Sequence, residues 1–219
     1  MKIAAYVMDK YAKQIYATES HNVRAWPGFE VVLHAVRTAG YTVEYAGRAT
    51  IHTFDVVLVS ITSDCDWWPF IAERATWKPG KPLVVAGGAG VLNVRPFLQA
   101  VDVFVLGRAE KLIVDLIGKH ESGDRIESPA VIWSDTFSPD NQYRIEQTDK
   151  PYPHTVTMTN GKPFKEQSIR CPHKCLFCGY TWQRRHISAG ERYGRQNMYL
   201  AKLRGRESYI DTQAGLYSC

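Results

Sequence analysis

The chain lacks long hydrophobic runs. No stretch approaches the roughly 18 apolar residues that a membrane-spanning helix needs. The apolar start, Met1–Met8, reaches Asp9 too soon for the core of a signal peptide. Internal repeats and low-complexity tracts are absent too. We therefore expect a cytoplasmic protein without a membrane partner, and its 219 residues would form one large or two small domains.

Cysteine is scarce and unevenly placed. Three of the five cysteines fall within the eight residues Cys171–Cys178. Cysteines clustered in this way do not form a framework of disulfides. They suit a reducing compartment, where thiols stay free to bind metal.

Positive charge is concentrated at one end of the chain. Residues 161–219 carry eleven Lys and Arg against four Asp and Glu, whereas residues 1–160 carry sixteen against eighteen. The basic half also holds the clustered cysteines. Two explanations are open: a solvated surface around an anionic metal cluster, or a polyanionic partner such as nucleic acid.

The first 120 residues alternate between short apolar runs and segments of helical periodicity. The expected strands are residues 3–8, 42–45, 55–61, 82–86 and 103–106, and the expected helices are centred on residues 29–36, 69–75, 94–100 and 112–117. Near-continuous β-branched runs such as 55–61 are typical of parallel strands covered on both faces. The pattern predicts an α/β domain over residues 1–120, with a five-stranded, doubly wound, flavodoxin-like parallel sheet.

Ligands of such a sheet bind beyond the carboxyl ends of its strands. The candidates there are Ser60, Gly87, Gly88 and Gly107. Glycine lets a backbone approach a flat or anionic ligand closely, but it also serves simply to make a tight turn. Both explanations remain open at this stage.

Residues 121–164 are rich in Pro, Ser, Gly and Asp, which is typical of a linker. The short runs Val131–Trp133 and Tyr143–Ile145 predict a small hairpin within it. Residues 165–219 form the next predicted domain. It begins with a strand over Lys165–Arg170 that leads directly into the cysteine segment.

That segment, Cys171-Pro-His-Lys-Cys175-Leu-Phe-Cys178, has the spacing C-x3-C-x2-C. Three thiolates on one loop can hold three irons of an iron–sulfur cube and leave the fourth iron open. A tetrahedral zinc site completed by His173 or His186 is the alternative, although zinc sites usually combine C-x2-C pairs.

With Phe177 before the third cysteine, the segment resembles the C-x3-C-x-aromatic-C motif of the radical S-adenosylmethionine (SAM) enzymes. The resemblance implies a [4Fe–4S] cluster held by the three cysteines, with SAM bound at its open iron. It also implies reductive cleavage of SAM to a 5′-deoxyadenosyl radical. Gly179 would let the backbone pass close to the cluster and SAM. A reductant such as flavodoxin or ferredoxin is the implied partner.

The runs Asp55–Ile61, Val84–Gly88 and Leu106–Glu110 resemble the cobalamin-binding domain that often precedes a radical SAM core. The likeness includes a serine on the third strand and paired glycines after the fourth. It departs at the D-x-H-x-x-G motif, where Tyr11 replaces the cobalt-binding histidine and Gln14 the glycine. The resemblance therefore implies either cobalamin bound without that histidine, with methyl transfer as the natural reaction, or a domain that has lost cobalamin.

Only 41 residues follow Cys178, far fewer than the family's (β/α) barrel needs. Residues 165–219 would supply its first part, with a second strand over Glu207–Gln213. We expect a fragment, one part of a split enzyme completed by a second chain, or a protein without radical chemistry. In the last case the alternative function is a non-catalytic iron–sulfur or zinc protein whose basic C-terminal segment binds nucleic acid. The sequence does not indicate a substrate.

Overall fold

The structure is a computed structural model of the whole chain. It describes residues 1–6, 8, 27–62, 66–77, 82–92, 94–141, 143, 144, 146, 152–158, 161 and 163–166. The chain divides into two compact units, residues 1–169 and residues 170–219. All of the second unit lies outside the described residues, as do the predicted barrel strands beyond Glu166.

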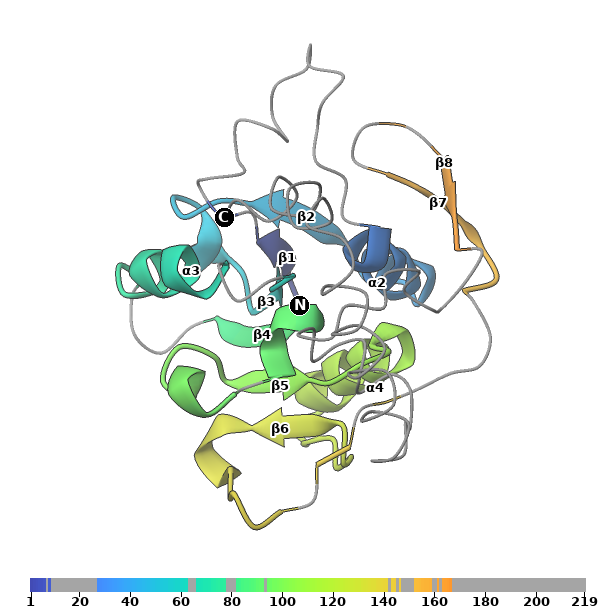
Figure 1. Cartoon of the computed structure of the whole chain (residues 1–219). Helices are drawn as coiled ribbons and strands as arrows, with labels where there is room; N and C mark the ends of the chain where they lie inside the picture. Colours follow the sequence, from blue (N-terminus) through green and yellow to red (C-terminus); the bar gives the residue numbers. More distant parts are fainter. Residues whose placement is uncertain are drawn as a thin grey trace, which may run out of the picture. The chain divides into compact units, whose positions relative to one another are not determined.

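The first unit is built on one mostly parallel sheet of six strands (Figure 1). These strands are β1 (Ile3–Tyr6), β2 (Val43–Ala46), β3 (Val56–Ser60), β4 (Leu83–Gly87), β5 (Val103–Val105) and β6 (Val131–Trp133). Their order across the sheet is β2-β1-β3-β4-β5-β6. The first five strands are parallel, and β6 runs antiparallel to β5. The structure confirms the predicted α/β fold with a mostly parallel sheet. The sheet has six strands, not the five that were predicted.

Three described helices of eight residues or more join these strands. They are α2 (Pro27–Thr38), α3 (Trp67–Arg74) and α4 (Glu110–Glu121). Helix α2 ends where Gly40 takes a φ of +95° and its N–H bonds to the carbonyl of Arg37. The helix expected over residues 94–100 is instead a 3-10 turn at Arg95–Phe97, where the N–H of Phe97 bonds to the carbonyl of Val94.

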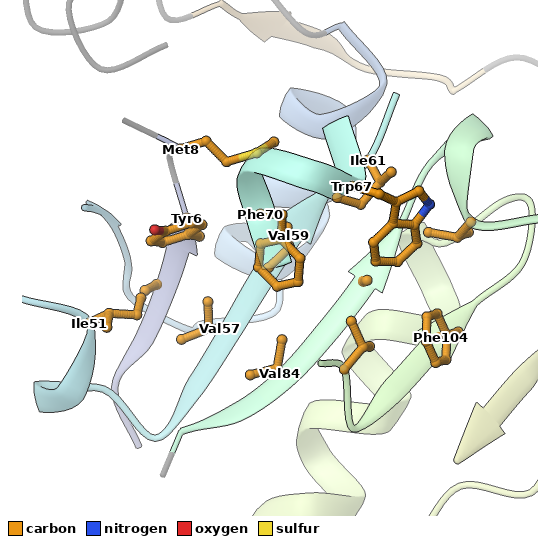
Figure 2. Packing of buried hydrophobic residues seen from close by; sticks show 14 of the residues in the cluster. Tyr6, Met8, Ile51, Val57, Val59, Ile61, Trp67, Phe70, Val84 and Phe104 are labelled. Atoms are coloured by element: carbon orange, nitrogen blue, oxygen red, sulfur yellow. The ribbon is translucent and has the colours of Figure 1, made fainter. Parts of the chain in front are cut away.

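The sheet buries apolar side chains on both faces, as a parallel sheet covered by helices should. On one face, Val57 and Val59 of β3 pack with Trp67 and Phe70 of α3 (Figure 2). On the other face, side chains from β3 pack against α2 and α4, which lie side by side. Alternate residues of β3 thus point to opposite cores.

Strand β6, whose residues were expected to form a hairpin with residues 143–145, pairs with β5 of the main sheet. Val131 pairs with Val105 and Ile132 with Phe104, so the segment extends the main sheet. Ile132 is buried in the α3-side core and Val131 in the α2-side core. Pairing with β5 therefore buries both side chains and covers a strand edge that would otherwise be open.

A second, two-stranded sheet follows in the same unit. Strands β7 (Thr155–Thr157) and β8 (Pro163–Lys165) pair antiparallel, and β7 contacts α2. Lys165 was expected to begin the first barrel strand, but it is the last residue of β8. The remainder of that expected strand, residues 167–170, lies outside the described residues.

Candidate functional site

The carboxyl ends of β3, β4 and β5 bring the predicted site residues of the first domain to one edge of the sheet. Ser60, the last residue of β3, pairs in register with Gly87, the last residue of β4. Gly87 pairs in turn with Val105, and Gly107 follows two residues later. Ser60, Gly87, Gly88 and Gly107 thus lie at or just after the carboxyl ends of neighbouring strands, as expected, and their contact with a ligand stays a prediction.

Gly88 is needed by the packing of the chain on itself. Its φ is +108°, and a Cβ atom at this position would lie 2.4 Å from the carbonyl oxygen of Ile61. Hydrogen bonds from Ile61 N to Gly87 O (2.8 Å) and from Gly90 N to Ile61 O (2.9 Å) hold the two loops together. A Cβ at Gly87 would meet only the carbonyl oxygen of Val105, at 3.6 Å. The tight-turn explanation therefore accounts for Gly88 without a ligand.

Thr62, two residues after the end of β3, is held by a buried carboxylate that the sequence analysis did not single out. Oδ2 of Asp66 accepts hydrogen bonds from the N–H of Thr62 (2.9 Å) and from its hydroxyl (2.7 Å). Only 1% of Asp66 is exposed. The sequence does contain a signal for this contact. Asp66 is a short polar residue directly before the helix that begins at Trp67, and side chains at such a position commonly accept hydrogen bonds from nearby N–H groups.

Trp67 joins this loop to the loop after β4. Its indole N–H donates to the carbonyl of Gly90 at 2.8 Å. Its ring stacks on Phe97, with centroids 3.8 Å apart and planes 6° from parallel. The indole is buried beside the ends of β3 and β4 (Figure 2). The indole of Trp67 therefore ties the start of α3 to the loop after β4.

The backbone at Gly107 is also engaged by the chain itself. The N–H of Glu146 donates to the carbonyl of Leu106 at 2.9 Å, and the N–H of Arg108 donates to the carbonyl of Glu146 at 2.9 Å. Gly107 has a φ of +90°, in the left-handed region that favours glycine. Residue 146 thus covers the carboxyl end of β5, and this conformation explains the glycine.

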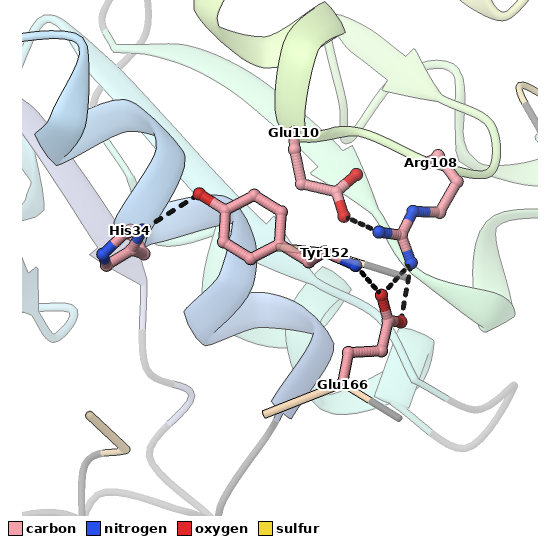
Figure 3. Close-up of polar contacts among 5 residues, drawn as sticks. All are labelled: His34, Arg108, Glu110, Tyr152 and Glu166. Atoms are coloured by element: carbon pink, nitrogen blue, oxygen red, sulfur yellow. Dashed lines mark hydrogen bonds and ion pairs between the residues drawn. The ribbon is translucent and has the colours of Figure 1, made fainter. Parts of the chain in front are cut away.

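A cluster of charged side chains lies directly after Gly107 (Figure 3). Nη1 of Arg108 donates to both carboxylate oxygens of Glu166, at 2.6 and 2.8 Å, and Nη2 lies 2.5 Å from Oε1 of Glu110. The N–H of Tyr152 donates to Oε2 of Glu166 at 2.6 Å. The side chains of Arg108, Glu110 and Glu166 are only 13–16% exposed. No local pattern in the sequence indicates this contact, since 58 residues separate Arg108 from Glu166.

Tyr152 extends the cluster to helix α2. Its hydroxyl lies 2.9 Å from Nδ1 of His34, and the ring of His154 lies 5.4 Å from that of Tyr152 and 5.7 Å from that of His34. Partial burial, and next the negative charge of Glu110, raise the pKa of Tyr152 above its ordinary value. The phenol therefore stays protonated and able to donate a hydrogen bond throughout the neutral range.

The predicted metal ligands Cys171, Cys175 and Cys178, together with Phe177 and Gly179, lie outside the described residues. Within the part of the chain that the structure describes, no three His, Cys, Asp or Glu side chains gather closely enough to hold a metal ion. None of the described helices is long and apolar enough to cross a membrane.

Comparison with known proteins gives one distant structural likeness. No family model and no curated protein matches the chain. A solved structure of the radical S-adenosylmethionine methyltransferase TsrM from Kitasatospora setae, with its tryptophan substrate and the SAM analogue aza-SAM bound, aligns with a TM-score of 0.45 and 16% identity. The alignment covers 60% of this chain and 28% of that one, so the chain spans little more than a quarter of that protein's length.

Proposed function

We propose that the chain is part of a radical SAM protein. The observation that carries the proposal is the segment Cys171–Cys178, in which three cysteines and an aromatic residue have the spacing C-x3-C-x-aromatic-C. Three thiolates are soft ligands that fit iron in a [4Fe–4S] cluster, and a missing fourth protein ligand leaves one iron for SAM. Phe177 and Gly179 would border this site.

The fold of the first unit agrees with the proposal without requiring it. A doubly wound domain in front of the cysteine segment is what the resemblance to cobalamin-dependent radical SAM proteins implies. When bound, the cluster would supply the electron that cleaves SAM to a 5′-deoxyadenosyl radical, and this radical would modify a substrate, with methylation as one outcome. Residues 165–219 would need further barrel strands, from a longer protein or from a second chain, to enclose that chemistry.

The proposal does not require cobalamin. Gly88 is explained by its contact with Ile61, and the indole of Trp67 is buried beside the ends of β3 and β4. Residues Tyr11 and Gln14 also depart from the cobalt-binding motif. If hydroxocobalamin does co-elute with the chain, the electron paramagnetic resonance (EPR) spectrum of its Co(II) form should lack splitting from a histidine nitrogen.

Anaerobic reconstitution with iron and sulfide tests the cluster. We expect about four irons and four sulfides per chain, with broad visible absorption. Cys175→Ala should abolish this absorption, whereas Cys65→Ala and Cys219→Ala, which remove cysteines outside the motif, should leave it unchanged. Stoichiometric zinc in place of iron after anaerobic purification would contradict the proposal.

A second assay separates catalysis from simple metal binding. The reconstituted chain is mixed with SAM and either dithionite or a reduced flavodoxin, and 5′-deoxyadenosine is measured. Formation of 5′-deoxyadenosine that depends on Cys175 supports a radical SAM protein. A stable cluster without that product, together with salt-sensitive retention of RNA or DNA, would favour the alternative. In that case the protein binds nucleic acid through its basic residues 161–219.

A further inference from the structure

Three ring-bearing side chains meet between helix α2 and the residues that lead into β7. They are His34 of α2 together with Tyr152 and His154, which precede the start of β7 at Thr155. The ring centroids lie 5.8 Å apart for His34 and Tyr152, 5.7 Å for the two histidines, and 5.4 Å for Tyr152 and His154. Since 118 residues separate His34 from Tyr152, the fold alone brings these side chains together.

The separation of the two imidazoles suits a shared metal ion. A zinc–nitrogen bond is about 2.0–2.1 Å long, so two imidazoles on one ion have centroids at most about 6.4 Å apart and about 5.2 Å apart at a tetrahedral angle. The 5.7 Å between His34 and His154 lies between these values. Because His154 is exposed, its ring can turn a nitrogen toward His34.

Tyr152 orients His34, which is the more buried of the two histidines. Its hydroxyl lies 2.9 Å from Nδ1 of His34, and Oγ1 of Thr38 lies 3.5 Å from the same nitrogen (Figure 3). A phenol hydroxyl accepts as well as donates hydrogen bonds, so Nδ1–H of His34 can donate to it. The proton then stays on Nδ1, and the lone pair of Nε2 is left to bind a metal ion.

The side chains around the pair determine the kind of ion. The nearest carboxylates described above, those of Glu110 and Glu166, are both bound by Arg108. Within the described ranges no third His, Cys, Asp or Glu joins the two histidines closely enough to bind the same ion, so water completes the coordination. Imidazole nitrogens favour zinc, copper and nickel over magnesium and calcium, which prefer oxygen ligands.

We propose that His34 and His154 bind a divalent transition-metal ion, with Tyr152 as the residue that orients His34. Two nitrogens and water hold an ion less tightly than three or four side chains do, so the ion exchanges with the solution. When bound, it joins α2 to the start of β7 and holds the β7–β8 sheet on that helix. The site uses residues of the first unit alone and does not depend on the proposed function.

Hydrogen exchange of backbone amides in the full-length chain, with Zn²⁺ or with EDTA, tests the site where it lies. Zn²⁺ should slow the exchange of residues 152–158 about tenfold or more, because the ion binds only while β7 lies on α2. His154→Ala, which changes an exposed side chain, should abolish this slowing, and so should His34→Ala. His52→Ala removes an exposed histidine outside the cluster and should keep it.

The number of bound ions gives a second, independent measurement. By equilibrium dialysis, His154→Ala should bind one Zn²⁺ per chain fewer than the wild type and His52→Ala do. Zinc taken up by the cysteines does not affect this difference, because every variant keeps them. Tyr152→Phe keeps the ring but removes the hydroxyl, and it should weaken the binding of this ion about tenfold without abolishing it.

Each result bears on a separate part of the inference. Zn²⁺ without effect on residues 152–158 of the wild type would overturn the site. Slowed exchange and zinc uptake that are the same in His154→Ala as in the wild type would overturn it too. Unchanged affinity in Tyr152→Phe would overturn the orienting role and leave a site of two histidines. Slowing by Mg²⁺ as strong as that by Zn²⁺ would contradict nitrogen ligands.

Discussion

Gly88 and Ile61 approach so closely that position 88 has no room for a side chain. A Cβ atom there would lie 2.4 Å from the carbonyl oxygen of Ile61 and 3.1 Å from its carbonyl carbon. The contact joins the backbone after β3 to the backbone after β4, as does the hydrogen bond from Gly90 N to Ile61 O. The edge of the sheet at which ligands were expected is therefore held in shape by contacts within the backbone.

Replacing Gly88 with alanine should lower the free energy of unfolding by about 2–4 kcal/mol, because the residue must keep a positive φ and a backbone must move. Gly87→Ala is the matched control. Its Cβ would meet only the carbonyl oxygen of Val105, at an ordinary contact distance of 3.6 Å. Urea unfolding, monitored by tryptophan fluorescence, measures the free energy of unfolding of both variants. Equal losses in the two variants would contradict the contact with Ile61.

The assignment of β6 to the main sheet makes a prediction about Ile132. This side chain is 3% exposed and packs in the core beside α3. Ile132→Ala should lower the free energy of unfolding by about 2–4 kcal/mol, the usual cost of emptying such a space. Ile126→Ala, at a half-buried position before the strand, should cost about 1 kcal/mol or less. A loss at Ile132 as small as that at Ile126 would mean that residues 131–133 do not complete the sheet.

The sequence predicted the parallel part of the fold well because each element carries its own local signal. The β-branched run that became β3 and the apolar stripe that became α4 are visible within a few residues of sequence. Strand β6 was missed as part of the sheet for the opposite reason. It has three residues, and its partner Phe104 lies 28 residues before Ile132, so nothing local indicates the pairing.

The same distinction applies to the candidate site. Ser60 and Gly87 were predicted together because parallel strands place their carboxyl ends at one edge. The contact of Arg108 with Glu166 was not, because a single arginine and a single glutamate far apart in sequence carry no pairing signal. The role of the cysteines stays a prediction from their spacing, since they lie outside the described residues.

The exposed pair of Arg125 and Asp135 predicts a pH effect of known sign. The hydrogen bonds from the Arg125 guanidinium are the largest of the effects that lower the pKa of Asp135 below its ordinary value of 3.8. The pair therefore contributes to stability above pH 3.8, and this contribution is lost as the pH falls through the lowered pKa. Arg125→Ala should raise the pKa of Asp135 toward 3.8 in a carboxyl titration followed by NMR. An unchanged titration would mean that the pair does not form in solution.

Tyr45 should make the first unit sensitive to alkaline conditions. Its hydroxyl donates a hydrogen bond to the carboxylate of Glu30, a residue of α2 that is only 3% exposed. Burial is the largest cause that raises the pKa of Tyr45 above its ordinary value of 10.0, followed by the hydrogen bond to Glu30 and by the charge of that carboxylate. The nearby Arg37 acts in the opposite direction but does not cancel these effects.

The sign of the pH dependence follows from the protonation of the two states. Above pH 10 the unfolded chain loses the phenol proton, whereas the folded chain keeps it, so the folded state binds more protons. The contribution of Tyr45 to stability is therefore complete below pH 10 and is lost as the pH rises toward the raised pKa of the folded state. Tyr45→Phe should lower the free energy of unfolding by about 1–2 kcal/mol at neutral pH, because it removes a hydrogen bond to a buried charged group.

The decisive measurement compares the slopes of stability against pH above pH 10. Wild type should lose stability faster than Tyr45→Phe, because only the wild type has this phenol to deprotonate on unfolding. Tyr41→Phe is the control, since the hydroxyl of Tyr41 makes only a longer bond of 3.4 Å to Glu121 at an exposed site. It should change both the neutral stability and the slope less than Tyr45→Phe does. Parallel curves for wild type and Tyr45→Phe above pH 10 would mean that the phenol of Tyr45 is not protected in the folded chain.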